Sequence, residues 1–196
     1  MSYITVQQIR ERFEQARRQS NVRTFSASTV LNEGRQISDS TKTFDIFLSH
    51  SSDDNEFVAG IKLILEDFGF TVYVDWNDPA LNPNRVTQKT AAILRERMSH
   101  CRSLVYAYSG NAQNSRWMPW ELGYFDGLKS SMVAVLPISR DANKSIQGSE
   151  YVGLYYAIGI DTISNTNRKA LWVNNGLEEY VNFNDWLKGI KPYRHK

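Results

Sequence analysis

An acidic residue interrupts an apolar helical face in the middle of the chain. Five residues have the spacing of that face: Trp117, Trp120, Glu121, Tyr124 and Leu128. Burial of a carboxylate without a partner is costly, so an acid in this position usually has a hydrogen-bond partner or a function. A single ionised carboxylate can hydrogen-bond the hydroxyls of a ligand and stabilise a developing positive charge. Glu121 is therefore the first candidate for chemistry.

Two structural explanations compete with a chemical role for Glu121. In a capping box, a Glu at the third helical position bonds back to a Ser or Thr at the cap. If Pro119 is the first helical residue, the cap is Met118, whereas with Ser115 as the cap the third position is Met118. Neither arrangement uses Glu121 as the capping acid. A salt bridge to an Arg or Lys from another segment stays open.

Small polar residues gather where the first predicted strand ends. Ser49, His50 and Ser51 lead into a predicted helix, where hydroxyls and free backbone amides can receive a polar ligand. Helix capping is the alternative role for the same residues. The turn contains no glycine, which excludes the glycine-rich loops that cradle dinucleotide or triphosphate groups.

A carboxylate and a tryptophan, Asp75 and Trp76, end the second predicted strand. Asp75 follows an apolar run, where a carboxylate can orient a neighbouring side chain; stabilisation of a turn is the alternative. The segment 76–85 contains two Pro and three Asn, which is typical of a loop. Ligands of parallel sheets bind beyond the carboxyl ends of the strands, so Ser49 and Asp75 are expected near the same site.

These residues require a frame of alternating strands and helices. Apolar runs predict five strands, at 44–49, 71–75, 104–108, 132–138 and 151–158. Helical spacing predicts helices at 57–68, 86–98, 117–128 and 177–188. Runs such as 132–136 are apolar on both faces, as a parallel sheet covered by helices on both sides requires. The alternation predicts an α/β fold with a doubly wound, mainly parallel five-stranded sheet.

The chain of 196 residues is long enough for one domain and an extension. Residues 3–19 have the spacing of a short amphipathic helix with a thin apolar stripe. Residues 20–42 are rich in Ser, Thr, Asn and Arg, which is typical of a linker or a partner-binding arm. We therefore predict an N-terminal helix and arm at 1–42 and the α/β domain at 43–196.

Composition limits the partners and the compartment. The 23 basic and 21 acidic residues leave a net charge of +2, which favours neither nucleic acid nor a membrane surface as the main partner. No window approaches about eighteen uninterrupted apolar residues, and the amino terminus lacks the apolar core of a signal peptide. Cys101 is the one cysteine, so no internal disulfide can form. We expect a soluble protein in the reducing cytoplasm.

Two motifs resemble those of Toll/interleukin-1 receptor (TIR) domains. The segment 44–50, FDIFLSH, is similar to the first TIR motif. The segment 109–117, followed by WEL at 120–122, resembles the motif that carries the glutamate of NAD-cleaving TIR domains. The resemblance covers about residues 43–190, and it implies the flavodoxin-like TIR fold.

The resemblance also implies an NAD-cleaving enzyme, similar to the Thoeris-like TIR proteins of bacterial antiphage defence. It implies Glu121 as the catalytic residue. Contacts to the substrate would come from Ser49, His50, Asp75, Trp76, Ser115 and Trp117. Trp117 would stack on nicotinamide, with core packing as the competing role. NAD would be the substrate, with no cofactor and no metal; self-assembly is expected, and the product would act on a separate effector protein.

One carboxylate is enough for this reaction. The bond from nicotinamide to ribose has a cationic pyridinium as its leaving group, so no proton donor is needed, unlike ordinary glycoside hydrolysis. Capture of the ribosyl cation by water, adenine or a ribose hydroxyl would decide between ADP-ribose and a cyclic isomer. Two alternatives stay open: a non-catalytic TIR adaptor that acts through homotypic protein contacts, and a relative of the nucleoside deoxyribosyl transferases.

Overall fold

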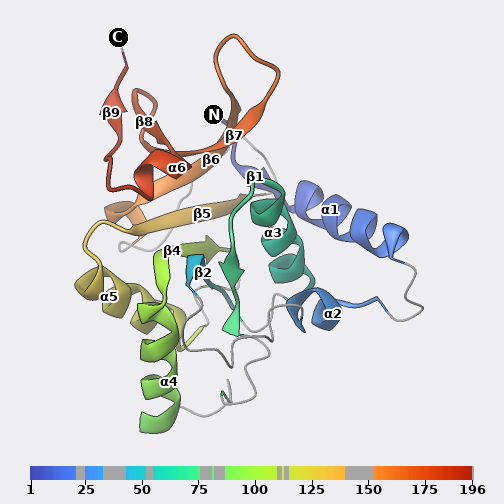
Figure 1. Cartoon of the computed structure of the whole chain (residues 1–196), viewed down its shortest axis with the longest axis vertical. Coiled ribbons are helices and arrows are strands. Elements are labelled where there is room, and N and C mark those ends of the chain that lie inside the picture. Colours follow the sequence, from blue (N-terminus) through green and yellow to red (C-terminus); the bar gives the residue numbers. More distant parts are fainter. Residues whose placement is uncertain are drawn as a thin grey trace.

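The computed structural model shows a mixed sheet that carries helices on both of its faces (Figure 1). The structure describes residues 1–20, 25–32, 43–51, 55–75, 81, 87–109, 112, 115–139 and 152–195. The helices within this part are α1 (Val6–Gln19), α2 (Ala27–Asn32), α3 (Asn55–Asp67), α4 (Gln88–Ser99), α5 (Met118–Leu128) and α6 (Phe183–Trp186).

The sheet has the strand order β3-β2-β4-β5-β6-β7-β8-β9, and β1 pairs with β5. The strands are β1 (Ile4–Thr5), β2 (Phe44–Ser49), β3 (Val72–Tyr73), β4 (Cys101–Tyr108), β5 (Val133–Ser139), β6 (Tyr156–Thr162), β7 (Lys169–Asn175), β8 (Glu179–Asn182) and β9 (Tyr193–Arg194). Pairing is parallel from β3 through β6 and antiparallel from β6 through β9. The predicted α/β class and the mainly parallel central sheet are confirmed.

The central strands are buried on both faces. On β4, Leu104 and Tyr106 belong to a core with α4 and α5, whereas Val105 and Ala107 belong to a core with α1, α2 and α3. Successive residues of a strand point to opposite faces, so one strand contributes to both cores. Gly69 follows α3 with a φ of 90°, a left-handed conformation that commonly ends helices and suits glycine.

The C-terminal region departs from the prediction. The predicted helix at 177–188 is wrong, because β8 and the one-turn helix α6 occupy this range. The predicted strand at 151–158 begins later, as β6, after a short 3-10 helix over Val152–Leu154. β7 pairs with β6 and turns into β8 at Gly176, whose φ of 82° suits glycine. Pairing with neighbouring strands overrides a weak local helical pattern, and the described sheet has nine strands rather than five.

The first residues of the chain lie inside the sheet. Near its start β5 pairs with β6, but Ile138 near its end pairs with Ile4 of β1. On the other side of β1, Ser2 forms a bridge to Ile160 of β6. β1 therefore lies between the diverging ends of β5 and β6.

Helix α1 packs on the same core as the sheet. Thr5 caps the helix in a capping box with Gln8. Ile9 is fully buried and Phe13 is 5 % exposed, and both belong to the core that contains α3. The structure thus confirms the predicted N-terminal helix and packs this predicted extension onto the α/β domain.

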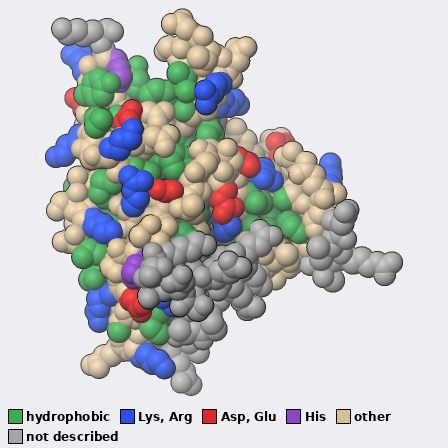
Figure 2. Space-filling view, in the orientation of Figure 1, with side chains coloured by type: hydrophobic (Ala, Val, Ile, Leu, Met, Phe, Trp, Pro, Cys, Tyr) green, Lys and Arg blue, Asp and Glu red, His purple; other side chains and the backbone are tan. Residues whose placement is uncertain are grey.

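The described surface mixes charges. On the face shown in Figure 2, basic and acidic side chains are interspersed rather than separated by sign. This distribution matches the near balance of 23 basic and 21 acidic residues in the sequence. In the part of the chain that the structure describes, no helix has the length and apolar character needed to cross a membrane.

Candidate active site

Helix α5 begins in a way that places Glu121 against the sheet. The Ser115 hydroxyl accepts a hydrogen bond from the Met118 N–H at 3.2 Å and so caps the turn that opens the helix. Pro119 stands in the first turn, where its missing N–H costs no hydrogen bond. The Glu121 N–H donates to the Trp117 carbonyl at 2.8 Å. The side chain of Glu121 is buried, with 3 % of the residue exposed.

Ser49 is the hydrogen-bond partner of Glu121. Its hydroxyl donates to Glu121 Oε2 at 2.6 Å, and both residues are buried. Ser49 is the last residue of β2, so the bond joins positions 72 residues apart in the chain. No capping box forms at α5, and among the described residues no Arg or Lys makes an ion pair with Glu121. The described partner of Glu121 is therefore a serine and not the Arg or Lys that the sequence analysis left open.

His50 and Asp75 form a second pair beside the first. His50 directly follows β2, and its Nε2 lies 2.9 Å from Asp75 Oδ1. Its Nδ1 lies 3.1 Å from the carbonyl oxygen of Ser51. The side chain of His50 is 5 % exposed and that of Asp75 is 25 % exposed. Because β2 and β3 are parallel neighbours, their carboxyl ends bring these two residues together.

The ionisable side chains influence one another's protonation. Burial raises the pKa of Glu121 to about 8, and the charge of Asp75 acts in the same direction. The Ser49 hydrogen bond and the charge of His50 oppose this rise. Burial lowers the pKa of His50, but the hydrogen bond and charge of Asp75, with smaller contributions from its other neighbours, outweigh burial and raise the pKa above 6.5. Glu121 is therefore a carboxyl group that titrates near neutral pH. The surroundings of the neighbouring His50 favour its protonated, positively charged ring.

The structure adds Tyr106, which the motifs do not indicate. Tyr106 of β4 is the register partner of Ser49 on β2, so both side chains point to the same face of the sheet. Burial raises the pKa of Tyr106 to about 12, and the charges of Glu121 and Tyr108 add to this shift. Its hydroxyl stays protonated and can donate a hydrogen bond. The alternation of Tyr106 and Tyr108 at the end of a predicted strand was the signal in the sequence.

Aromatic rings line the start of α5. Trp117 and Trp120 meet edge to face with centroids 5.4 Å apart, and Trp120 stacks on Tyr124 at 5.5 Å. The guanidinium of Arg95 lies 5.9 Å from the Trp120 ring centroid. Trp117 packs partly on the core, and its Nε1 is buried without a hydrogen-bond partner among the described residues. Packing on the core accounts for part of the burial of the Trp117 side chain. Stacking of its ring on a substrate stays a proposal.

Two further predicted substrate contacts are Ser115 and Trp76. The capping bond to Met118 gives Ser115 a structural role without a ligand. Trp76 lies outside the described residues. Within the described segments, no cluster of three or more His, Cys, Asp or Glu side chains could hold a metal ion.

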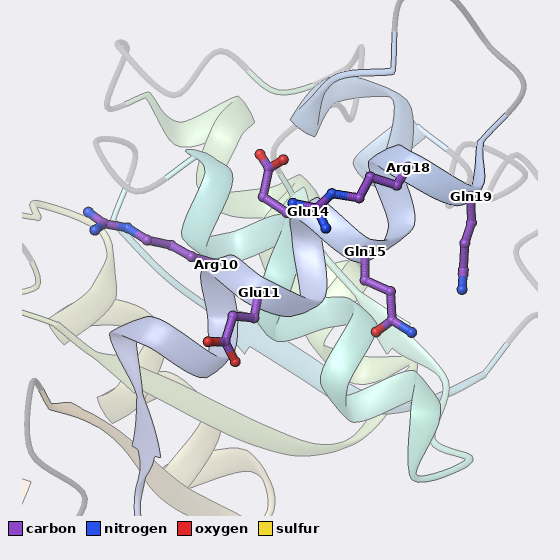
Figure 3. Close-up of a pocket in the computed structure, with 6 residues that line it drawn as sticks. All are labelled: Arg10, Glu11, Glu14, Gln15, Arg18 and Gln19. Carbon is purple, nitrogen blue, oxygen red and sulfur yellow. The ribbon is translucent and has the colours of Figure 1, made fainter.

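Two hollows on the described surface lie away from Glu121. One, of about 470 Å³, lies along a single helix, α1 (Figure 3), and is lined by Arg10, Glu11, Glu14, Gln15, Arg18 and Gln19. The other, of about 270 Å³, is lined by Asp126, Ser131, Val133, Leu154, Tyr155 and Tyr156. In Figure 3 acidic and basic side chains extend from the same helix, so the first hollow favours neither a positively nor a negatively charged ligand. The candidate site is therefore defined by the buried polar contacts of Glu121.

Comparison with known proteins relates these features to a family. The TIR domain family matches residues 46–170, a range that contains Ser49, His50, Asp75 and Glu121. The chain is 43 % identical over 165 residues to "Probable 3' cyclic ADP-D-ribose synthase ThsB'" of Bacillus cereus (strain MSX-D12), which covers 83 % of this chain and 85 % of the relative. It is 25 % identical over 96 residues to "Putative cyclic ADP-D-ribose synthase TIR2" of Cytobacillus dafuensis, which covers 48 % of this chain and 25 % of that relative. The chain belongs to the TIR domain family.

Proposed function

We propose that this chain is an enzyme that cleaves NAD between nicotinamide and ribose, with Glu121 as its catalytic residue. The observation that carries the proposal is the buried Glu121 carboxyl, which Ser49 orients at the carboxyl end of β2. Membership of the TIR family and the names of the two relatives as cyclic ADP-D-ribose synthases support it. The 3' cyclic product named for the Bacillus cereus relative favours a cyclic isomer over linear ADP-ribose.

The reaction breaks the bond between the anomeric carbon of ribose and the ring nitrogen of nicotinamide. The electron pair leaves with the nitrogen, so the cationic pyridinium becomes neutral nicotinamide and positive charge develops on the ribose. The Glu121 carboxylate stabilises this charge and binds the ribose hydroxyls, an electrostatic effect typically worth about 3 kcal/mol. A ribose hydroxyl, an adenine nitrogen or water then forms the new bond to ribose and releases a proton.

The residues around Glu121 have proposed roles in binding. His50 and Asp75 help to hold the ribose and phosphates, and Trp117 stacks on the nicotinamide ring. Trp76 and Ser115 are further proposed contacts. Ser49 acts mainly by orienting Glu121, because its one hydroxyl proton is already donated to that carboxylate. The reaction uses NAD as substrate and needs no metal or cofactor.

The proposed enzyme acts in a wider system. We propose that its copies assemble through TIR contacts, and that the released product signals to a separate effector protein in antiphage defence. A reducing cytoplasm fits the chain, because its one cysteine, Cys101, can form no internal disulfide.

Release of nicotinamide from NAD by purified protein tests the proposal. We expect Glu121→Gln to lower the rate by about 100-fold or more, because it keeps the size of the side chain and removes its charge. Glu96→Gln on the exposed side of α4 makes the same chemical change away from the site and should leave the rate unchanged. Mass spectrometry of the nucleotides identifies the product.

The assay has two informative failures when it is run over a range of protein concentrations. NAD cleavage by Glu121→Gln at the wild-type rate would remove Glu121 from catalysis. If even concentrated wild-type protein released no nicotinamide, a non-catalytic adaptor would be the better description of the chain.

A further inference from the structure

Both ring nitrogens of His50 face hydrogen-bond acceptors. Nδ1 lies 3.1 Å from the Ser51 carbonyl oxygen, which can only accept. Nε2 lies 2.9 Å from Asp75 Oδ1, which accepts when the carboxylate is ionised. A neutral imidazole carries one N–H, so its other nitrogen would direct a lone pair at one of these two oxygens, whereas the imidazolium forms an ion pair with Asp75.

The negative charges of two carboxyl groups, Asp75 and Glu121, both raise the pKa of His50 and so favour its protonated form. The His50 side chain is 5 % exposed, so water screens its charge only weakly. The positive charge of His50 acts in turn on Glu121. It lowers the pKa of the carboxyl and so opposes burial and the charge of Asp75, which raise that pKa. Among the residues that the structure describes, the Ser49 hydroxyl, which donates to Glu121, and the neutral phenol of Tyr106 also face this carboxyl.

We propose that His50, held as an imidazolium by Asp75 and the Ser51 carbonyl, is a positioning residue that increases the ionised fraction of Glu121 for catalysis. Two carboxylates and one imidazolium leave a net charge of −1, which suits a site that stabilises a ribosyl cation. The catalytic part of this inference rests on the proposed function. The charge state of His50 rests on the geometry alone and can be tested without substrate.

Nuclear magnetic resonance of the histidine rings tests the charge state. The chain contains three histidines, His50, His100 and His195, so replacing each by Gln assigns the three signals. We expect the His50 ring to titrate at a pH above 6.5, and Asp75→Asn to move its midpoint downward. A wild-type His50 that titrates at or below 6.5 would overturn the proposal.

The catalytic consequence is measured in the pH profile of kcat/KM for NAD cleavage. Glu121 must lose its proton, so activity should rise with pH. In His50→Gln this rise should move to higher pH by roughly 1 unit or more, so the loss in kcat/KM should be about tenfold greater at pH 7 than at high pH, where only the proposed contact of His50 with the substrate is missing. His100→Gln, at the C-terminal end of α4, is the matched control and should leave the profile in place.

The outcomes separate this inference from the proposed function. A loss in His50→Gln that is equal at every pH would contradict the positioning role, since a merely structural defect does not move the midpoint. If the wild-type chain cleaved no NAD, the proposed function would fail, and the ring titration would still decide whether His50 is an imidazolium.

Discussion

At the scale of single residues, Glu121 carries a cost in stability. A glutamate carboxyl in water has a pKa of 4.5, and in the folded chain burial and the charge of Asp75 raise the pKa of Glu121 to about 8. Between these two pH values the folded chain binds more protons than the unfolded chain. The contribution of Glu121 to stability is therefore fully present below the lower value and is lost as pH rises through the higher one.

The upward shift of the Glu121 pKa leads to a prediction for the stability of Glu121→Gln. We expect the variant to melt a few degrees above the wild-type chain at pH 8.5, at roughly 2–4 °C per kcal/mol, and close to it at pH 5. Thermal unfolding followed by circular dichroism at both pH values measures the difference. Glu96→Gln removes an exposed charge and should match the wild type at each pH. A lower melting temperature of Glu121→Gln at pH 8.5 would mean that the ionised carboxylate stabilises the fold.

At the scale of elements, α1 and α3 approach each other at a glycine. A Cβ on Gly60 would lie 2.5 Å from the carbonyl oxygen of Ile9 and 2.6 Å from its Cγ2. The nearer atom belongs to the backbone, so a larger residue must displace α1 as a whole. Glycine at position 60 therefore sets the distance between the two helices.

Gly60→Ala should destabilise the chain even though Ala favours helices. We expect the free energy of unfolding to fall by roughly 1–3 kcal/mol, since overpacking forces backbone shifts. Gly123→Ala in α5 is the control: its Cβ would meet nothing within 4 Å, and helix propensity should raise stability by about 0.5–1 kcal/mol. Urea denaturation compares the two. Equal gains at both positions would contradict the close packing of α1 and α3.

At the scale of the whole molecule, the N-terminal segment completes the sheet. β1 lies between β5 and β6, and the Met1 amino group is 2.8 Å from the carboxylate of Asp161. Ile4, Val30 and Leu31 are buried in the core that also contains α3. The described residues before 43 therefore cover part of one face of the predicted domain.

A chain that begins at Thr43 should be much less stable than the full chain. Loss of even two large buried aliphatic side chains costs about 4 kcal/mol or more, and we expect the melting temperature to fall by roughly 10 °C or more. Differential scanning calorimetry measures the change, and residues 1–42 supplied as a separate peptide should restore part of it. An unchanged melting temperature would show that residues 43–196 fold as an independent domain.

The sequence by itself determined the elements whose signal is local. The strands β2 and β5 and the helices α3 and α5 follow from apolar runs and helical spacing, which act over a few residues. Glu121 was recognisable because an acid on an apolar face conflicts with the pattern around it. The TIR motifs then connected Glu121 with Ser49, although no periodicity relates two positions so far apart.

Tertiary structure decided every feature that depends on distant partners. The Ser49 hydroxyl reaches Glu121 because α5 packs against β2, and Asp75 reaches His50 because β2 and β3 pair in parallel. The range 177–188 became β8 and α6 rather than one helix, because β7 offers β8 a ladder of backbone hydrogen bonds. Such contacts depend on which segments meet in the fold, and local propensity is too weak to specify that choice.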